Sequence, residues 1–278
     1  MSTNTTFEAP IRSLPAQELV TPSPLTLNQG QVALMCRTPA HGLICPVIQT
    51  DSPMSELPVG AFLGPRPGDP QLQVIGRQWL PGDTPPLQQA AATLRTVTEC
   101  TFDSEPKTCH AWQQGYSLAW VTLSDAGFQG LRHDCSGPQI PELLRIELFL
   151  SLDQGFVFPD DLASLKGLLA HLALNQGFDM IVTTGGTGVT SRDITPEATL
   201  SLIQRRLPGF EQAMLSASMA KTHHGLISRA VAGILHRTLI INLPGSPKAV
   251  AENLTPLLPA LRHCLDKIHD DPRDCASS

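Results

Sequence analysis

The chain has 278 residues, 41% hydrophobic and 16% charged, with a formal net charge of −6 at pH 7. This length suits one large domain or two smaller ones, each with its own core. With 19 lysines and arginines in no basic block, and one tyrosine, nucleic acid is not an expected partner. The N-terminus lacks the apolar core of a secretory signal, and no apolar run reaches membrane-span length. We therefore expect a cytoplasmic protein without membrane contact.

Seven cysteines are spread along the chain, and none forms a Cys-x-x-Cys pair. A zinc ribbon is therefore not indicated. Cys109 and His110 are adjacent, but no second pair lies at ligand spacing, so this dipeptide does not indicate a metal site. The odd number of cysteines and the expected compartment favour reduced thiols.

Residues 1–112 predict a small β-rich domain whose role the sequence does not indicate. Its apolar runs are short, and turns rich in proline and glycine separate them. The runs that we interpret as strands cover residues 31–36, 41–49, 60–64 and 71–76. The segment LQQAAATLRTV, residues 87–97, is predicted as a helix.

Residues 113–270 predict an α/β domain, followed by a tail at 271–278. Strands are expected at 116–125, 147–152, 178–184 and 237–245, and helices at 139–146, 160–174, 195–207, 208–220 and 246–254. The run at 178–184 is apolar without alternation, as expected for a strand covered on both faces. The alternation of strands and helices predicts a three-layer domain with a mostly parallel sheet.

In such sheets, ligands bind beyond the carboxyl ends of the strands. The stretch TTGGTGVTSRD, residues 183–193, follows one expected strand. Its glycines can take positive φ and let backbone N–H groups approach an anion. Ser246 and Pro247 begin a helix after another strand, and a helix N-terminus favours phosphate. The glycines fit neither a Walker loop, since no lysine follows them, nor a dinucleotide fingerprint, since Ser191 takes the third glycine place.

Two acidic residues stand close to these segments. Asp193 follows the glycine loop, and Asp160 follows a strand and opens a helix. Each has a structural alternative, because Asp160 or Asp161 could cap the helix and Asp193 could stabilise its own turn. Two carboxylates beside bound phosphates can also hold Mg²⁺, so the pair is compatible with nucleotide chemistry.

Seven short stretches occur in an order that resembles a known family. They are VTLSD (121–125), DCSGP (134–138), PDD (159–161), TTGGTGVTSRDITPEAT (183–199), PGFEQAM (208–214), LISRAVAG (226–233) and NLPGSPKAV (242–250). Over about residues 116–268 the chain resembles the molybdopterin adenylyltransferases of the MogA type, which are related to the gephyrin G domain. The MoeA and CinA families share the fold but have other glycine loops, resembling G-G-V-S-V-G and G-G-L-G-P-T.

The resemblance implies a MoaB/MogA-like fold, usually a homotrimer, that uses ATP and Mg²⁺ to adenylylate molybdopterin and releases pyrophosphate. It implies catalytic and Mg²⁺-binding roles for Asp160 and Asp193. The implied binding residues are Ser124, Asp125, Thr184, Gly185, Gly186, Thr187, Gly188, Ser228, Asn242, Pro244, Gly245 and Ser246. Other proteins of molybdenum cofactor biosynthesis are candidate partners. The alternative is a non-catalytic module that binds the pterin or acts as a scaffold.

Overall fold

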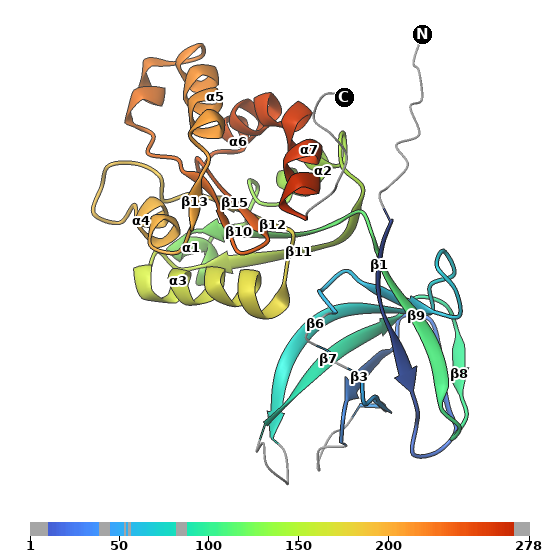
Figure 1. Ribbon diagram of the computed structural model, residues 1–278. Coiled ribbons are helices and arrows are strands. Elements are labelled where there is room, and N and C mark those ends of the chain that lie inside the picture. Colours follow the sequence, from blue (N-terminus) through green and yellow to red (C-terminus); the bar gives the residue numbers. More distant parts are fainter. Residues whose placement is uncertain (1–10, 39–44, 53, 55–56, 82–87, 270–278) are drawn as a thin grey trace. The chain divides into compact units, whose positions relative to one another are not determined.

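The computed structural model describes residues 11–38, 45–52, 54, 57–81 and 88–269 (Figure 1). The chain divides between Tyr116 and Ser117 into two compact units. We call residues 11–116 the β unit and residues 117–269 the α/β unit. Within these described ranges, none of the helices has both the length and the apolar character that a membrane span requires.

The β unit contains a seven-stranded sheet in the order β1-β9-β5-β6-β7-β3-β4 and a two-stranded sheet of β2 and β8. The pair β3–β4 is parallel, and the other pairings of the large sheet are antiparallel. The strands are β1 (Ile11–Leu19), β2 (Leu25–Leu27), β3 (Val32–Cys36), β4 (Val47–Gln49), β5 (Phe62–Gly64), β6 (Leu72–Pro81), β7 (Gln88–Thr96), β8 (Cys100–Phe102) and β9 (Lys107–Gln114).

The helix predicted at residues 87–97 is wrong, because this segment forms strand β7. Its alanines and leucine favour a helix, but β7 pairs with β6 on one side and β3 on the other. Ala92, Leu94 and Thr96 are buried, while Thr93 and Arg95 are more exposed. Cross-strand pairing and this alternating burial override the intrinsic preference of the segment. Residues 87 and 97 flank the strand, and residue 87 lies outside the described ranges, as do residues 41–44 of the run predicted at 41–49.

The α/β unit is built on a six-stranded sheet in the order β11-β10-β12-β15-β14-β13. Strands β10, β12 and β15 are parallel, whereas β14 and β13 continue the sheet in antiparallel pairings. The predicted α/β fold is confirmed, with a mixed rather than mostly parallel sheet. The strands are β10 (Tyr116–Leu123), β11 (Leu150–Phe158), β12 (Met180–Thr184), β13 (Arg205–Arg206), β14 (Ala232–Leu235) and β15 (Thr238–Leu243).

Helices cover both faces of this sheet (Figure 1). Helices α2, α6 and α7 lie on one face, and α3 lies on the other. The helices are α1 (Asp125–Phe128), α2 (Gln139–Leu144), α3 (Leu162–Ala170) with its π-helical continuation η2 (His171–Gln176), α4 (Thr195–Leu200), α5 (Pro208–Met219), η3 (His223–Ile227), α6 (Pro247–Leu254), η4 (Thr255–Leu257) and α7 (Leu258–Ile268). Several predicted bounds shift, and two shift most. The helix expected at 195–207 ends at Leu200, and Arg205–Arg206 form strand β13 instead. The strand expected at 147–152 runs from Leu150 to Phe158.

The parallel strands align their carboxyl ends. Every residue of β12 and β15 is buried, which explains the unbroken apolar runs of these strands. The register places Thr184 beside both Thr122 and Leu243. The segments that follow these three strands therefore emerge together at one edge of the sheet, where a ligand is expected.

Candidate active site

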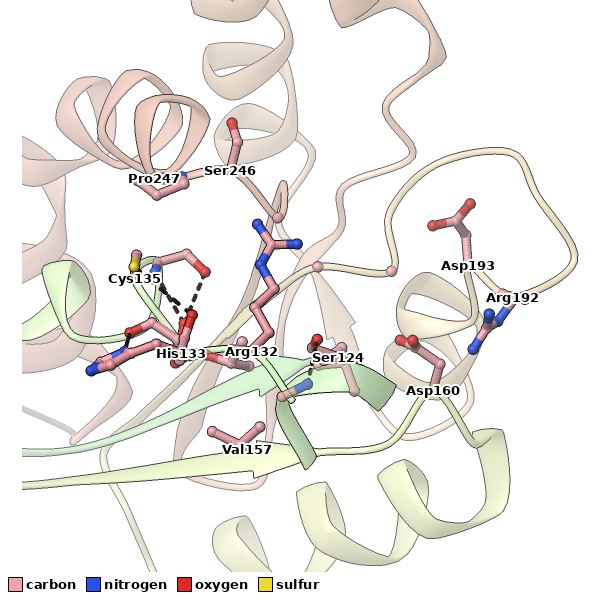
Figure 2. Close-up of a pocket in the computed structure, with 18 residues that line it drawn as sticks. Ser124, Arg132, His133, Cys135, Val157, Asp160, Arg192, Asp193, Ser246 and Pro247 are labelled. Atoms are coloured by element: carbon pink, nitrogen blue, oxygen red, sulfur yellow. Dashed lines mark hydrogen bonds between the residues drawn. The ribbon is translucent and has the colours of Figure 1, made fainter. Parts of the chain in front are cut away.

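A cleft of about 480 Å³ lies at this edge of the sheet. Its lining comes from the segments after β10, β11, β12 and β15 and from the loop after α1 (Figure 2). Asp160, Arg192 and Asp193 stand at one end of the cleft, and His133 and Cys135 stand at the other. The lining residues are Thr122, Leu123, Ser124, Gly127, Arg132, His133, Asp134, Cys135, Ser136, Val157, Asp160, Gly185, Gly186, Arg192, Asp193, Gly245, Ser246 and Pro247.

The glycine turn after β12 is held in one conformation. Gly185 and Gly186 have φ values of 101° and 64°, in the left-handed region that favours glycine. A Cβ at Gly185 would lie 2.7 Å from the carbonyl oxygen of Leu123. The Gly185 amide donates to the Leu243 carbonyl at 3.0 Å, and the Gly185 carbonyl accepts from the Thr195 hydroxyl at 2.9 Å. The turn is thus tied both to β15 and to the start of α4.

Thr195 lies inside the helix α4 and not at its N-cap. Ile194 is the residue before the first turn of α4, and Thr195 lies inside the helix, followed by Pro196. The hydroxyl of Thr195 binds the glycine turn instead of the helix N-terminus. By contrast, Ser246 caps α6 as its sequence predicts, because its hydroxyl accepts the Ala249 amide at 3.2 Å.

The structure separates the two adjacent acids at the start of α3. Asp161 is the helix cap, and its carboxylate accepts the Ser164 amide at 2.8 Å. Asp160 lines the cleft instead. Burial and the negative charge of Asp193 raise the pKa of Asp160 above its ordinary value. The charge of Asp193 therefore acts on Asp160 at the same end of the cleft.

Asp193 both stabilises its turn and lines the cleft. Its Oδ2 accepts hydrogen bonds from the Thr190 amide at 2.8 Å and from the Thr190 hydroxyl at 2.6 Å. Burial acts to raise the pKa of Asp193, but the bonds from Thr190 and from the Gly188 amide, with the charge of Arg229, lower it overall. The two carboxylates thus have pKa values displaced in opposite directions, an arrangement common at functional sites.

Asp134 lines the cleft and is not among the predicted site residues, although it begins the stretch DCSGP. Its Oδ2 accepts the Thr122 hydroxyl at 2.6 Å, and its Oδ1 accepts the amides of Ser136 and Gly137 at 3.0 and 3.1 Å. Burial acts to raise the pKa of Asp134, and these bonds outweigh it and lower the pKa. Asp134 therefore shapes the loop that carries His133 and Cys135.

Two arginines in the cleft are also absent from the predicted set. Arg192 forms an ion pair with Asp125. Arg132 extends between the two ends of the cleft (Figure 2). The adjacency of Arg192 to Asp193 is visible in the sequence, but nothing there indicates that Arg132 lines the same cleft as the glycine turn. The guanidinium group of Arg132 is suited to binding phosphate oxygens.

Seven of the predicted residues line the cleft: Ser124, Asp160, Gly185, Gly186, Asp193, Gly245 and Ser246. The other seven lie around it and do not line it. Of these, Asp125 binds the backbone of Asp160, and the Thr184 hydroxyl donates to the Pro244 carbonyl at 2.8 Å. Thr187 is buried, and its carbonyl accepts the Arg229 amide.

Gly188, Ser228 and Asn242 complete the residues outside the lining. Gly188 provides an amide to Asp193. The Ser228 hydroxyl is buried and has no hydrogen-bond partner among the described residues. Asn242 is fully buried, and its Nδ2 donates to the hydroxyls of Thr183 and Thr199 at 3.0 and 2.9 Å. This places Asn242 beneath the strand ends rather than at the cleft surface.

Asp160 and Asp193 fit a magnesium site in which substrate phosphate supplies further ligands. No group of three or more histidine, cysteine or acidic side chains at metal-binding geometry occurs in the described part of the chain. Mg²⁺ does not need such a group, since it is typically held by one or two carboxylates, substrate phosphates and water. Burial and the charge of Asp193 raise the pKa of Asp160, and a bound cation would relieve the repulsion between the two carboxylates.

The fold and the cleft define a MoaB/MogA-like α/β protein with an acid pair and a glycine turn at the ends of parallel strands. Residues 119–263, a little over half of the chain, match the family described as a probable molybdopterin binding domain. The chain belongs to this family.

Two curated relatives illustrate the extent of the similarity. A gephyrin from Dictyostelium discoideum is 39% identical over 170 residues, covering 58% of this chain and 24% of that protein. A molybdopterin adenylyltransferase from Helicobacter pylori strain J99 is 38% identical over 156 residues, covering 56% of this chain and 89% of that protein. The chain thus spans a minor part of the gephyrin and most of the adenylyltransferase.

Solved structures agree with this assignment. MoaB from Thermus thermophilus superposes with a TM-score of 0.51 at 39% identity, covering 57% of this chain and 98% of that one. A MogA structure superposes with a TM-score of 0.52 at 37% identity, covering 55% of this chain and 99% of that one. The matched family span lies entirely within the α/β unit.

Proposed function

We propose that the α/β unit transfers the adenylyl group of ATP to molybdopterin and releases pyrophosphate. The observation that carries this proposal is the meeting of Asp160, Asp193, the glycine turn and the α6 N-terminus in one cleft. Family membership and the adenylyltransferase relatives support it. Phosphoryl-group transfer depends mainly on positioning and charge neutralisation, which such a cleft can supply.

In the proposed reaction, a terminal phosphate oxygen of molybdopterin attacks the α-phosphorus of ATP. The bond from that phosphorus to the bridging oxygen breaks, and pyrophosphate leaves with the electron pair. No covalent bond to the protein forms. Asp160 and Asp193 would hold Mg²⁺, which would supply positive charge to neutralise the phosphates. Gly186 lets phosphate approach the backbone, and the capped start of α6 favours an anion near Ser246.

A direct assay tests the proposal. The full chain is incubated with molybdopterin, ATP and Mg²⁺, and the products are identified by mass. We expect adenylyl-molybdopterin and one equivalent of pyrophosphate. The variant Asp161→Asn is a matched control, because asparagine also caps helices and Asp161 lies outside the cleft. Binding of molybdopterin without any product would favour the non-catalytic alternative.

We also propose that the chain forms a homotrimer through the α/β unit. Neighbouring segments α5 and η3 leave the apolar side chains of Leu215, Met219, Leu226 and Ile227 exposed. Contiguous exposed apolar surface often marks an interface. Sedimentation equilibrium measures the assembly, and we expect Leu226→Asp to shift it towards monomer. A wild-type chain that sediments as a monomer at all concentrations would contradict the trimer.

A further inference from the structure

Asp125 uses both oxygens of one carboxylate to join two segments that carry the candidate catalytic acids. Its Oδ1 accepts the backbone N–H of Asp160 at 3.0 Å. Its Oδ2 forms an ion pair with Arg192, the residue directly before Asp193. The segment that begins α3 is thus bound to the loop after β12 through a single side chain.

The position of Asp125 is itself fixed. The preceding residue, Ser124, caps α1 by accepting the Gly127 amide at 3.1 Å. The Ser124 amide donates to the Phe158 carbonyl at 2.9 Å, which ties the end of β10 to the end of β11. Asp125 therefore follows a strand end whose position is fixed by hydrogen bonds. The loop that carries Arg192 binds to the Asp125 side chain.

Arg229 holds the same loop at its base. Its Nε donates to the Gly188 carbonyl at 2.6 Å, and its Nη2 donates to the Asp193 carbonyl at 2.7 Å. Gly188 and Asp193 bound the loop at residues 188–193, so Arg229 joins its two ends. The Asp125–Arg192 pair adds an attachment on the Asp160 side.

Global stability does not explain the Asp125–Arg192 pair. The Arg192 side chain is 68% exposed and that of Asp125 is 35% exposed. Exposed ion pairs contribute little to the free energy of folding. A small displacement of a reacting group, however, can lower a rate by about 100-fold when geometry governs catalysis. The Asp125–Arg192 pair therefore affects the positions of the candidate catalytic acids more than it affects the free energy of folding.

We propose that Asp125 and Arg192 are positioning residues that set the separation of Asp160 and Asp193. Arg192 acts through Asp125 and not by binding a substrate phosphate. This inference rests on the proposed adenylyl transfer for its catalytic consequence. Its structural consequence, an ordered loop at residues 188–193 before any ligand binds, is independent of that reaction.

The test uses the full chain with Asp125→Asn, Arg192→Gln and the double variant. Asparagine keeps an oxygen for the Asp160 amide but loses the charge that pairs with Arg192. We expect each single variant to lower kcat by about 10-fold, with little change in the KM for ATP, and the double variant to match the singles. Without ligand, hydrogen exchange at residues 186–194 should be faster in all three variants than in wild type.

The variant Arg145→Gln is the matched control, because it breaks the Arg145–Asp153 ion pair in the same unit but outside the cleft. It should leave both kcat and the exchange of residues 186–194 unchanged. Additive losses of kcat, or a raised KM for ATP in Arg192→Gln, would show that Arg192 binds substrate directly. Unchanged exchange in the variants would overturn the proposal even if the wild-type chain yields no product.

Discussion

The two units show how strand direction determines where polar residues from different segments can lie close together. Successive strands of an antiparallel sheet end at opposite edges, so the connecting segments of the β unit are divided between those edges. In the α/β unit, β10, β12 and β15 are parallel, and their carboxyl ends meet at one edge. The segments that follow them bring Ser124, Gly185, Asp193 and Ser246 to one cleft. A site of several residues from distant parts of the chain follows from that shared direction.

Cys135 of the α/β unit differs from the buried cysteines of the β unit. Cys36, Cys100 and Cys109 are buried in the β unit. Burial raises the pKa of Cys100 to about 11 and also raises the pKa of Cys109. Cys135 of the α/β unit is exposed and lines the cleft. The β unit thus uses these thiols as core side chains, whereas the α/β unit presents one at its candidate site.

Among the variants that test this comparison of the two units, Asp193→Asn is expected to have the largest effect. The amide keeps an oxygen for the Thr190 bonds but loses the negative charge in the cleft. We expect product formation to fall by about 100- to 1,000-fold, since charged groups at reacting phosphates contribute on this scale. Mass detection of adenylyl-molybdopterin measures the loss, and circular dichroism checks the fold. Near-normal product would remove Asp193 from the catalytic set.

The variant Gly64→Ala should affect the β unit alone. A Cβ at Gly64 would collide with the carbonyl of Asp69 and lie 3.3 Å from the Trp112 ring. We expect destabilisation of the β unit by about 2 kcal/mol, from overpacking. Hydrogen exchange should accelerate in β5, β6 and β9 but not in β12 or β15. A comparable loss of protection in the α/β sheet would show that the two units unfold together.

Gly185→Ala tests the glycine turn of the α/β unit. Its φ of 101° and the nearby Leu123 carbonyl make alanine strained there, and we expect a loss of about 1–2 kcal/mol. Gly167→Ala is the matched control, because Gly167 lies within α3 and a Cβ there meets no atom within 4 Å. That change should stabilise the unit by roughly 0.5–1 kcal/mol. Chemical denaturation measures both, and equal effects would contradict a strained turn.

The smallest expected effect is that of Asp160→Asn on thermal stability. The pKa of Asp160 is raised in the folded protein, so this group lowers stability progressively as the pH rises above its unfolded pKa, and the loss is complete above its folded pKa. At about pH 3, below the usual aspartate pKa, both states are protonated and the effect vanishes. We expect Asp160→Asn to raise the Tm by about 1–3 °C at pH 7 and to leave it unchanged at pH 3. A lower Tm at pH 7 would show that the Asp160 charge is stabilising.

Local patterns in the sequence predicted the α/β fold and much of the cleft. The unbroken apolar run of β12, followed by Gly185 and Gly186, indicated a buried strand ending in a tight turn. This inference works because positive φ and burial are properties of single segments. The helix predicted at 87–97 failed for the opposite reason: pairing with β3 and β6, which lie elsewhere in the chain, decides the conformation of β7.

Only the tertiary structure determined which side chains cap a helix, line the cleft or contact each other. The sequence left Asp160 and Asp161 as equal candidates for the helix cap, and the fold assigns the cap to Asp161 and turns Asp160 into the cleft. It also joins Asp125 to Arg192 across 67 positions of sequence. Such contacts depend on the register and direction of whole strands. The sequence by itself determined the parallel strands β10, β12 and β15, the glycine turn and the acids, whereas only the packed sheet determined which of these segments meet.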